Sequence, residues 1–261
     1  MLTDAHCHPA DLAEHFPAAE DQRRQLGVMC AASATCTEEF NYCERLSREA
    51  QTANAAPLLP CFAVHPQLPA MNQLTIFNEP LTMLEALAAQ GRLAAVGETG
   101  FDLYNAAFRE TEKTQDELFA AHLEIALRHN LPLVIHARRA MHKIFACSAA
   151  LKKCRAIIFH SWPGTAGEGE SLLKRGINAF FSFGAAIMLN HREAMRCCAM
   201  FPADRLLTET DAPYQPPRGA AFSTYADLAR IVEAAAALRG ETAAALEKII
   251  EANFCNAFGV A

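Results

Sequence analysis

The sequence predicts an α/β protein with a (β/α)8 barrel of the TIM type, on three observations. Short apolar segments of strand length recur eight times along the 261 residues. Segments with helical periodicity separate most of them, an alternation typical of a parallel sheet covered by helices. The length suits one closed barrel, which needs about 250 residues. We expect a single domain over residues 1–261, and an open doubly wound sheet is the alternative.

The expected strands are apolar almost throughout rather than alternating, which is typical of strands buried on both faces. They comprise residues 2–7, 27–31, 58–64, 93–97, 131–136, 156–159, 178–183 and 206–209.

The expected helices between the strands show apolar residues at a spacing of three to four. Thr37 is expected to cap the first of them. Two Ala-rich helices should follow the last strand and pack outside the barrel. The helices comprise residues 37–51, 81–90, 111–129, 141–151, 168–175 and 192–201, then 224–238 and 243–255.

The composition indicates a globular protein, because 52% of the residues are hydrophobic and 20% are charged. No apolar run approaches the roughly 20 residues of a membrane helix, and the first residues, MLTDAHCHP, do not resemble a signal peptide. We therefore expect a cytoplasmic protein without a membrane partner. The net charge of −6 leaves no broad basic stripe for duplex DNA, so any nucleic-acid binding must be local.

The ten cysteines are scattered, and many stand in apolar stretches, as Cys30 and Cys61 do. Reduced, buried thiols are expected. Cys197 and Cys198 are adjacent, but neighbours on a helix point in different directions, so we expect no structural zinc there.

Metal-binding side chains gather on the expected strands. His6 and His8 stand two residues apart on the first strand and therefore share a face, together with Asp4. Four more follow apolar segments: Glu98 after LAAVG, His136 after LPLVI, His160 after AIIF and Asp211 after RLLTET. The carboxyl ends of barrel strands converge on one mouth, where active sites are built.

Four histidines and two carboxylates are more than one tetrahedral ion needs and suit two divalent cations. One carboxylate must then bridge, and we expect Glu98 to do so, since no lysine stands at a strand end. Such ligands accept Zn, Mn, Co, Ni or, less readily, Mg, which leaves the identity of the ions open.

The chain resembles the TatD-like metal-dependent deoxyribonucleases of the amidohydrolase superfamily. The resemblance lies in TDAHCHP, AVHP, VGETGFD, LPLVIHAR, FHSWPG, LLTETDAPY and NFCNAFG, in that order. It implies one TatD-like hydrolase domain, with His6, His8 and Asp211 on one ion, His136 and His160 on the other, and Glu98 as the bridge. The chain departs from the usual pattern at Thr99, Phe101 and Ser161-Trp162.

The expected reaction is attack on a phosphodiester by a water that two metal ions activate. Glu98 and Asp211 are the expected catalytic carboxylates, and Asp211 would take the proton from the water. The alternative for Asp211 is the N-cap of a helix.

Three residues are candidates for substrate binding. Arg138 would hold a phosphate, with a solvated surface arginine as the alternative. His65 would touch the substrate or serve the structure, and Trp162 would stack on a base or pack in the core. Asp102 and Tyr104 are expected to shape the loop after Glu98, and Glu209 to support the ligands.

Three hypotheses for the function follow. The first is a DNA exonuclease or phosphodiesterase that acts as a monomer on ends or single strands, with RNA not excluded. The second is a hydrolase of a small-molecule lactone, amide or carboxylic ester, since one dinuclear centre serves many bonds. The third is a non-catalytic metal-stabilised scaffold, which would predict the loss of Glu98 or Asp211.

Overall fold

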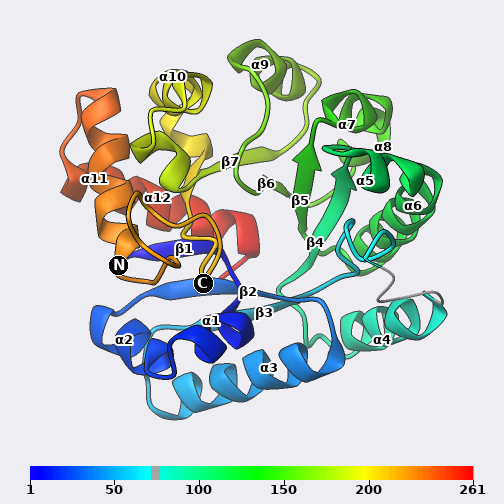
Figure 1. Cartoon of the computed structure of the whole chain (residues 1–261), viewed down its shortest axis with the longest axis horizontal. Helices are drawn as coiled ribbons and strands as arrows, with labels where there is room; N and C mark the ends of the chain where they lie inside the picture. The colour runs from blue at the N-terminus through cyan, green and yellow to red at the C-terminus, as the bar shows by residue number, and fades with distance from the viewer. Residues whose placement is uncertain (72–76, 261) are drawn as a thin grey trace.

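The computed structural model describes residues 1–71 and 77–260, and within them eight parallel strands pair in chain order from β1 to β8. The two ends of the sheet also meet: the Asp211 amide donates to the His6 carbonyl at 2.9 Å, and the His8 amide donates to the Ala212 carbonyl at 2.8 Å. The sheet therefore curls into a nearly closed barrel, with helices around it in Figure 1. An open doubly wound sheet would place β1 in its interior, so the predicted (β/α)8 barrel is confirmed.

All eight predicted strands are present, with bounds moved by a few residues. The largest change is in the fourth, which runs beyond Glu98 because its residues continue to pair with the fifth strand. The strands are β1 (Thr3–Cys7), β2 (Met29–Ala34), β3 (Leu58–Phe62), β4 (Ala95–Asp102), β5 (Leu133–Arg138), β6 (Ile157–Phe159), β7 (Ala179–Phe183) and β8 (Leu206–Thr208).

The predicted helices are also present, although the segment 141–151 is divided into two. The helices are α3 (Thr37–Thr52), α4 (Asn78–Ala89), α6 (Glu112–His129), α7 (Met141–Ala146), α8 (Ser148–Leu151), α9 (Ala166–Lys174), α10 (Arg192–Met200), α11 (Asp227–Arg239) and α12 (Ala243–Phe258).

Sequence periodicity missed five short elements, because one or two turns offer too few positions for a pattern to be seen. They are α1 (Pro9–His15), α2 (Ala19–Leu26), α5 (Ala106–Glu110) and the 3-10 turns η1 (Ala185–Met188) and η2 (Ala203–Arg205). The predicted cap was wrong: Cys36 is the N-cap of α3, and the Thr37 hydroxyl, inside the first turn, contacts Met83 Sδ at 3.2 Å.

The core has an inner and an outer layer. The inner layer fills the barrel with side chains such as Ala5, Val134 and Phe180, and the outer layer lies between strands and helices. The prediction that the last helices pack outside holds for α11, but α12 contributes Phe254 and Phe258 to the inner layer. All ten cysteines are free and most are buried, as predicted. No helix within the described ranges is long and apolar enough to cross a membrane.

Candidate metal centre

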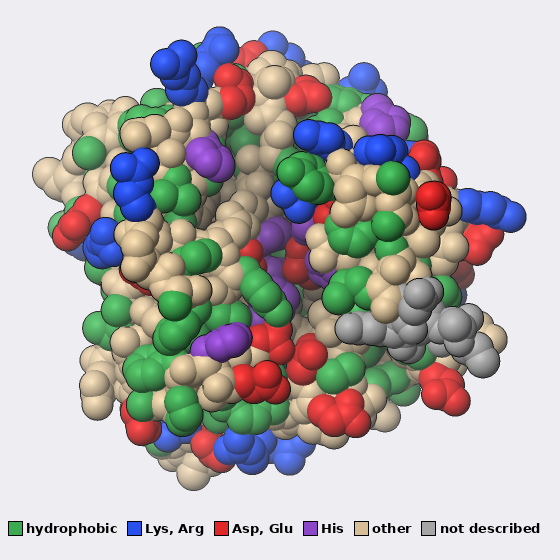
Figure 2. All heavy atoms as spheres, viewed as in Figure 1, with side chains coloured by type: hydrophobic (Ala, Val, Ile, Leu, Met, Phe, Trp, Pro, Cys, Tyr) green, Lys and Arg blue, Asp and Glu red, His purple; other side chains and the backbone are tan. Residues whose placement is uncertain are grey.

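A cavity of about 970 Å³ opens at the carboxyl ends of the strands. Figure 2 shows it as a hollow with histidine and acidic side chains at its floor. Its walls include His8, Glu98, His136, His160 and Asp211. The strand ends thus bring predicted ligands from five separate stretches of sequence to one place.

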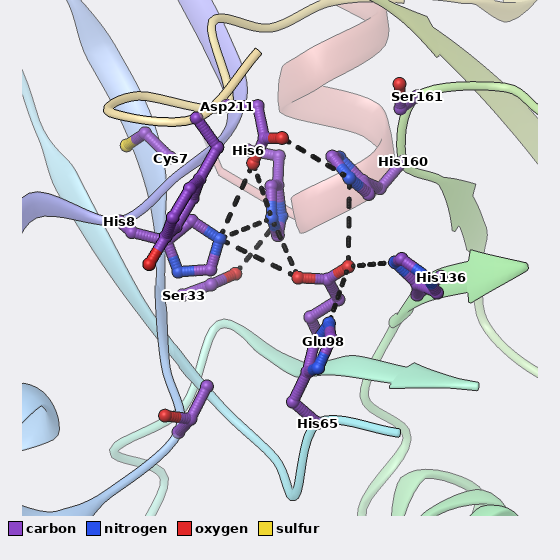
Figure 3. A network of polar contacts seen from close by, with 12 residues as sticks. His6, Cys7, His8, Ser33, His65, Glu98, His136, His160, Ser161 and Asp211 are labelled. Atoms are coloured by element: carbon purple, nitrogen blue, oxygen red, sulfur yellow. Dashed lines mark hydrogen bonds and ion pairs between the residues drawn. The ribbon is translucent and has the colours of Figure 1, made fainter. Parts of the chain in front are cut away.

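His6, His8 and Asp211 form one side of the centre (Figure 3). The Nε2 atoms of the two histidines are 3.0 Å apart, and Asp211 Oδ1 lies 3.6 Å from the first and 3.5 Å from the second. Asp211 reaches this position because its backbone, with a positive φ of 55°, turns in toward β1. The helix-cap alternative for Asp211 is wrong, since the next helix, α11, begins at Asp227 after Ala226.

Glu98 lies between this group and the remaining histidines. Its Oε2 atom is 3.1 Å from His6 Nε2 and 3.7 Å from His8 Nε2. Its Oε1 atom is 2.7 Å from His136 Nδ1 and 3.7 Å from His160 Nε2. One carboxylate oxygen therefore faces each side of the centre, the placement that a bridging ligand needs.

Two further carboxylates support these histidines from behind. Asp102 Oδ2 is 3.1 Å from His136 Nε2 and accepts a 2.7 Å hydrogen bond from Gln67. Glu209 Oε1 is 3.0 Å from His160 Nδ1. Asp4 was predicted to share the face of His6, but it pairs in register with Cys30, and β1 is irregular between Asp4 and Cys7. Its carboxylate accepts hydrogen bonds from the Thr210 amide and hydroxyl and so joins β1 to the segment after β8.

His65 belongs to the centre more directly than the sequence suggested. Its Nε2 atom lies 3.4 Å from Glu98 Oε1, and with Glu98 and His136 it forms a group whose ligand atoms are all within 4.8 Å. His65 follows β3 just as His136 and His160 occur at the ends of their strands, so the same rule could have placed it among the ligands.

The donor set fits divalent cations. Within the described residues, two other groups have ligand atoms within 4.8 Å, His6 with His8 and Asp211, and His6 with Glu98 and His160. Asp211 Oδ1 is buried without a hydrogen-bond partner, and the two Nε2 atoms of His6 and His8 face each other. Buried polar atoms that lack a hydrogen-bond partner raise the free energy of the folded protein, unless an ion binds in the space between them.

The carboxylates and the histidines shift one another's pKa values. Burial opposes the charge of Glu98, but the surrounding His65, His6 and His160 hold the pKa of this carboxyl well below its usual range. Burial likewise opposes a proton on His160, yet Glu209, Asp211 and Glu98 raise its pKa to about 10. The carboxylates at the floor of the cavity are therefore ionised, and a cation bound there would replace the proton on His160.

The predicted substrate residues divide into two kinds. Arg138 is exposed, lines the cavity, and stacks on Tyr104 with its Cζ atom 3.6 Å from the ring centroid. Trp162 also borders the cavity, but it is only 4% exposed and packs edge-on against Phe159 and Phe181. This geometry favours the core-packing alternative for Trp162 over base stacking.

Sequence reasoning missed Gln215, whose side-chain amide donates to Asp211 Oδ2 at 2.8 Å and whose oxygen accepts from the Ser161 hydroxyl at 3.1 Å. No local pattern marks a glutamine in an irregular loop as a partner of Asp211. Thr99 and Phe101, where the chain departs from the usual family pattern, have side chains that point away from the centre. Thr99 contacts His122, and Phe101 packs against Phe119.

Three comparisons with known proteins find similarity to TatD-related nucleases and metal-dependent hydrolases. The sequence profile described as "TatD related DNase" matches residues 3–259. The 3'-5' ssDNA/RNA exonuclease TatD of Shigella flexneri is 33% identical over 182 residues, which cover 67% of this chain and 69% of that protein. The uncharacterized metal-dependent hydrolase YcfH of Escherichia coli is 29% identical, with coverage of 100% and 96%.

The crystal structure of YJJV, a TatD homologue from Escherichia coli, superposes with a TM-score of 0.85 at 24% identity and covers 100% of this chain and 98% of its own. With the barrel and the centre, these relatives identify the chain as an enzyme of the hydrolase class that acts on ester bonds. Within that class, the chain belongs to the TatD-related DNase family.

Proposed function

We propose that this hydrolase removes nucleotides from the ends of single-stranded DNA, with two divalent cations held at the mouth of the barrel. The observation that carries the proposal is the position of Glu98, with one oxygen toward His6 and the other toward His136. A second support is the family relative that is a 3'-5' ssDNA/RNA exonuclease. RNA is therefore the substrate to test beside DNA.

His6, His8 and Asp211 would hold one cation, and His136 and His160 the other, with Glu98 shared between them. His65 is close enough to Glu98 to take part on the second side. Bound divalent cations supply a water of lowered pKa and neutralise charge on the phosphoryl oxygens. Imidazole and carboxylate ligands of this kind accept Zn, Mn, Co, Ni or Mg.

The chain's own residues would orient the substrate and deprotonate the attacking water. Gln215 donates to Asp211 Oδ2, which leaves the buried Oδ1 atom directed at the centre to accept a proton from the attacking water. Arg138 at the rim would bind the phosphate of the substrate through the edge of its guanidinium. Glu98 would stay ionised, because its histidine neighbours lower its pKa.

Hydrolysis of a small lactone, amide or ester is the second candidate, and the relatives do not favour it. The third hypothesis, a non-catalytic metal-stabilised scaffold, predicts the loss of Glu98 or Asp211, and both residues are present in this chain. A monomeric state and a cytoplasmic location stay predictions from the sequence.

The test is hydrolysis of 5'-labelled single-stranded DNA by protein loaded in turn with Mn, Zn, Co, Ni or Mg. We expect stepwise shortening, and a loss of about 10²- to 10⁴-fold in Asp211→Asn, the size typical of a general base. Asp204→Asn is the matched control, because Asp204 is 72% exposed and outside the cavity.

Parallel reactions contain RNA and a panel of lactones, amides and carboxylic esters. Inert DNA and RNA with turnover of a small substrate would replace the proposal by the second candidate. Equal rates for the wild type and Asp211→Asn would remove Asp211 from the mechanism.

A further inference from the structure

Two arginines and a tyrosine form an exposed stack at the rim of the cavity. Tyr104 follows β4 and is 42% exposed, Arg138 is the last residue of β5, and Arg139 follows it. The guanidinium carbons of Arg138 and Arg139 lie 3.6 Å and 4.6 Å from the centroid of the Tyr104 ring. An aromatic ring that carries two cations lowers their repulsion and holds them in place.

The stack is fixed by backbone contacts as well. Arg139 donates to the Tyr104 carbonyl at 3.1 Å, and Arg109 of α5 donates to the same carbonyl at 3.4 Å and to the Leu103 carbonyl at 3.3 Å. We call Tyr104, Arg109, Arg138 and Arg139 the arginine ridge. Within residues 1–71 and 77–260, none of its arginines forms an ion pair with a carboxylate, so their charge is available to an anion.

The opposite rim carries the opposite charge. Asp11 of α1 and Glu39 of α3 line the cavity on that side, and Asp11 accepts a 2.8 Å hydrogen bond from the Tyr214 hydroxyl. Figure 2 shows mainly acidic side chains directly below the hollow, and basic side chains, with some acidic ones, above it and to its right. A polyanion that enters this cavity is repelled by one rim and attracted by the other.

We infer that the arginine ridge binds the phosphates of a single strand as it leaves the cavity, so that the strand runs from the metal centre across Arg138 to Arg139. The inference rests on the proposed function and adds to it the path of the substrate. A guanidinium stacked by its face keeps its edge donors for phosphate oxygens. Because these contacts reach phosphates rather than bases, the ridge favours longer strands without a preference for their sequence.

The test compares hydrolysis of thymidine dinucleotides and octanucleotides by the metal-loaded enzyme. In Arg139→Gln we expect a severalfold higher KM for the octanucleotide, an unchanged kcat, and an unchanged KM for the dinucleotide, which is too short to reach Arg139. The slope of log(kcat/KM) against log[salt] for the octanucleotide should become less steep by roughly 0.7, the value for one phosphate contact on a single strand.

Arg230→Gln is the matched control, because Arg230 on α11 is 62% exposed, pairs with Asp227 and does not line the cavity. Tyr104→Leu is a second variant, and removal of the ring should raise the octanucleotide KM while the melting temperature stays near that of the wild type. An octanucleotide KM unchanged in both variants would overturn the ridge and leave the proposed function intact.

If Arg139→Gln raised the KM for the dinucleotide and the octanucleotide equally, Arg139 would act at the metal centre. That result would also contradict the inference that the arginine ridge binds the outgoing strand. A wild-type enzyme that hydrolyses neither oligonucleotide but turns over a small ester would overturn the proposed function and the ridge with it.

Discussion

His160 Nδ1 lies 3.0 Å from Glu209 Oε1, and the Glu209 side chain is fully buried. The same oxygen accepts a 2.8 Å hydrogen bond from the Ser161 amide, so Glu209 is held in place by the backbone that follows β6. This contact turns the other ring nitrogen of His160 toward Glu98 and Asp211, which lie 3.7 Å and 3.9 Å from it. Carboxylates behind metal-binding histidines commonly set ring orientation and basicity in this way.

We therefore expect Glu209→Gln to weaken metal binding by about 10- to 100-fold, since the amide loses the charge that favours a correctly oriented ring. The measurement is metal affinity by competition with a chelator. Glu170→Gln, half exposed on α9, is the control and should bind metal as the wild type does. Wild-type affinity in Glu209→Gln would show that His160 is oriented without Glu209.

Gly100 is expected to tolerate no side chain. It has a φ of +133°, and a Cβ atom built on it would lie 2.0 Å from the His136 carbonyl oxygen, because β4 and β5 pair Gly100 with His136. Gly100→Ala should therefore displace His136 from Glu98 and lower both metal affinity and the melting temperature. Gly91→Ala separates the effect of the steric clash from the effect of backbone strain. Gly91 also has a positive φ, of +67°, but it has open space around it.

Gly91→Ala should lose only about 1 kcal/mol of stability, the usual cost of a left-handed residue. Metal binding by Gly100→Ala equal to that of Gly91→Ala would contradict the proposed clash.

His122 should make the stability of the protein depend on pH. It is buried between the Val64 amide, which donates to Nε2 at 3.1 Å, and the Thr99 hydroxyl, 2.8 Å from Nδ1. Burial lowers the pKa of His122 from 6.5 to about 3. The unfolded chain takes up this proton below pH 6.5 while the folded chain stays neutral, so the free energy of unfolding falls as the pH is lowered from 6.5 toward 3.

At pH 7 the free energy of unfolding of His122→Gln should be about 1 to 3 kcal/mol below that of the wild type, because the buried Val64 amide and Thr99 hydroxyl lose their partner. This gap should narrow by about 2 kcal/mol at pH 5, at 1.4 kcal/mol per pH unit below 6.5. Urea denaturation of the metal-free proteins measures it, with the exposed His142→Gln as control. A gap that stays constant between pH 7 and 5 would mean that folded His122 does titrate.

Arg23 is expected to be a principal determinant of stability at the amino end of the barrel. Its fully buried guanidinium donates to the Val28 and Ala56 carbonyls at 2.6 Å and 2.8 Å and pairs with Glu20 at 2.8 Å. Arg23→Ala should lower the free energy of unfolding by about 3 to 5 kcal/mol, because these buried partners are left without a donor.

Arg24→Ala is the neighbouring control, since Arg24 also pairs with Glu20 but is 32% exposed. It should cost no more than about 1 kcal/mol in urea denaturation. Equal losses in the two variants would show that burial of Arg23 adds nothing.

The sequence by itself determined the architecture and most of the centre. Apolar segments buried on both faces can be recognised locally, and each of them became a strand. His136 and His160 could be identified because a polar residue at the end of such a segment is placed at the mouth by the barrel itself. His6 and His8 share a face because side chains alternate along a strand.

Only the tertiary structure decided which of these residues meet, and which polar groups support them. Gln215 contacts Asp211, and His65 contacts Glu98, because strand register and loop path bring them together across the chain. Trp162 packs against Phe181 because the outer layer has room for its ring, which composition cannot reveal. A local pattern fixes the direction of a side chain relative to its own strand, whereas the distance between two side chains depends on the closure of the whole barrel.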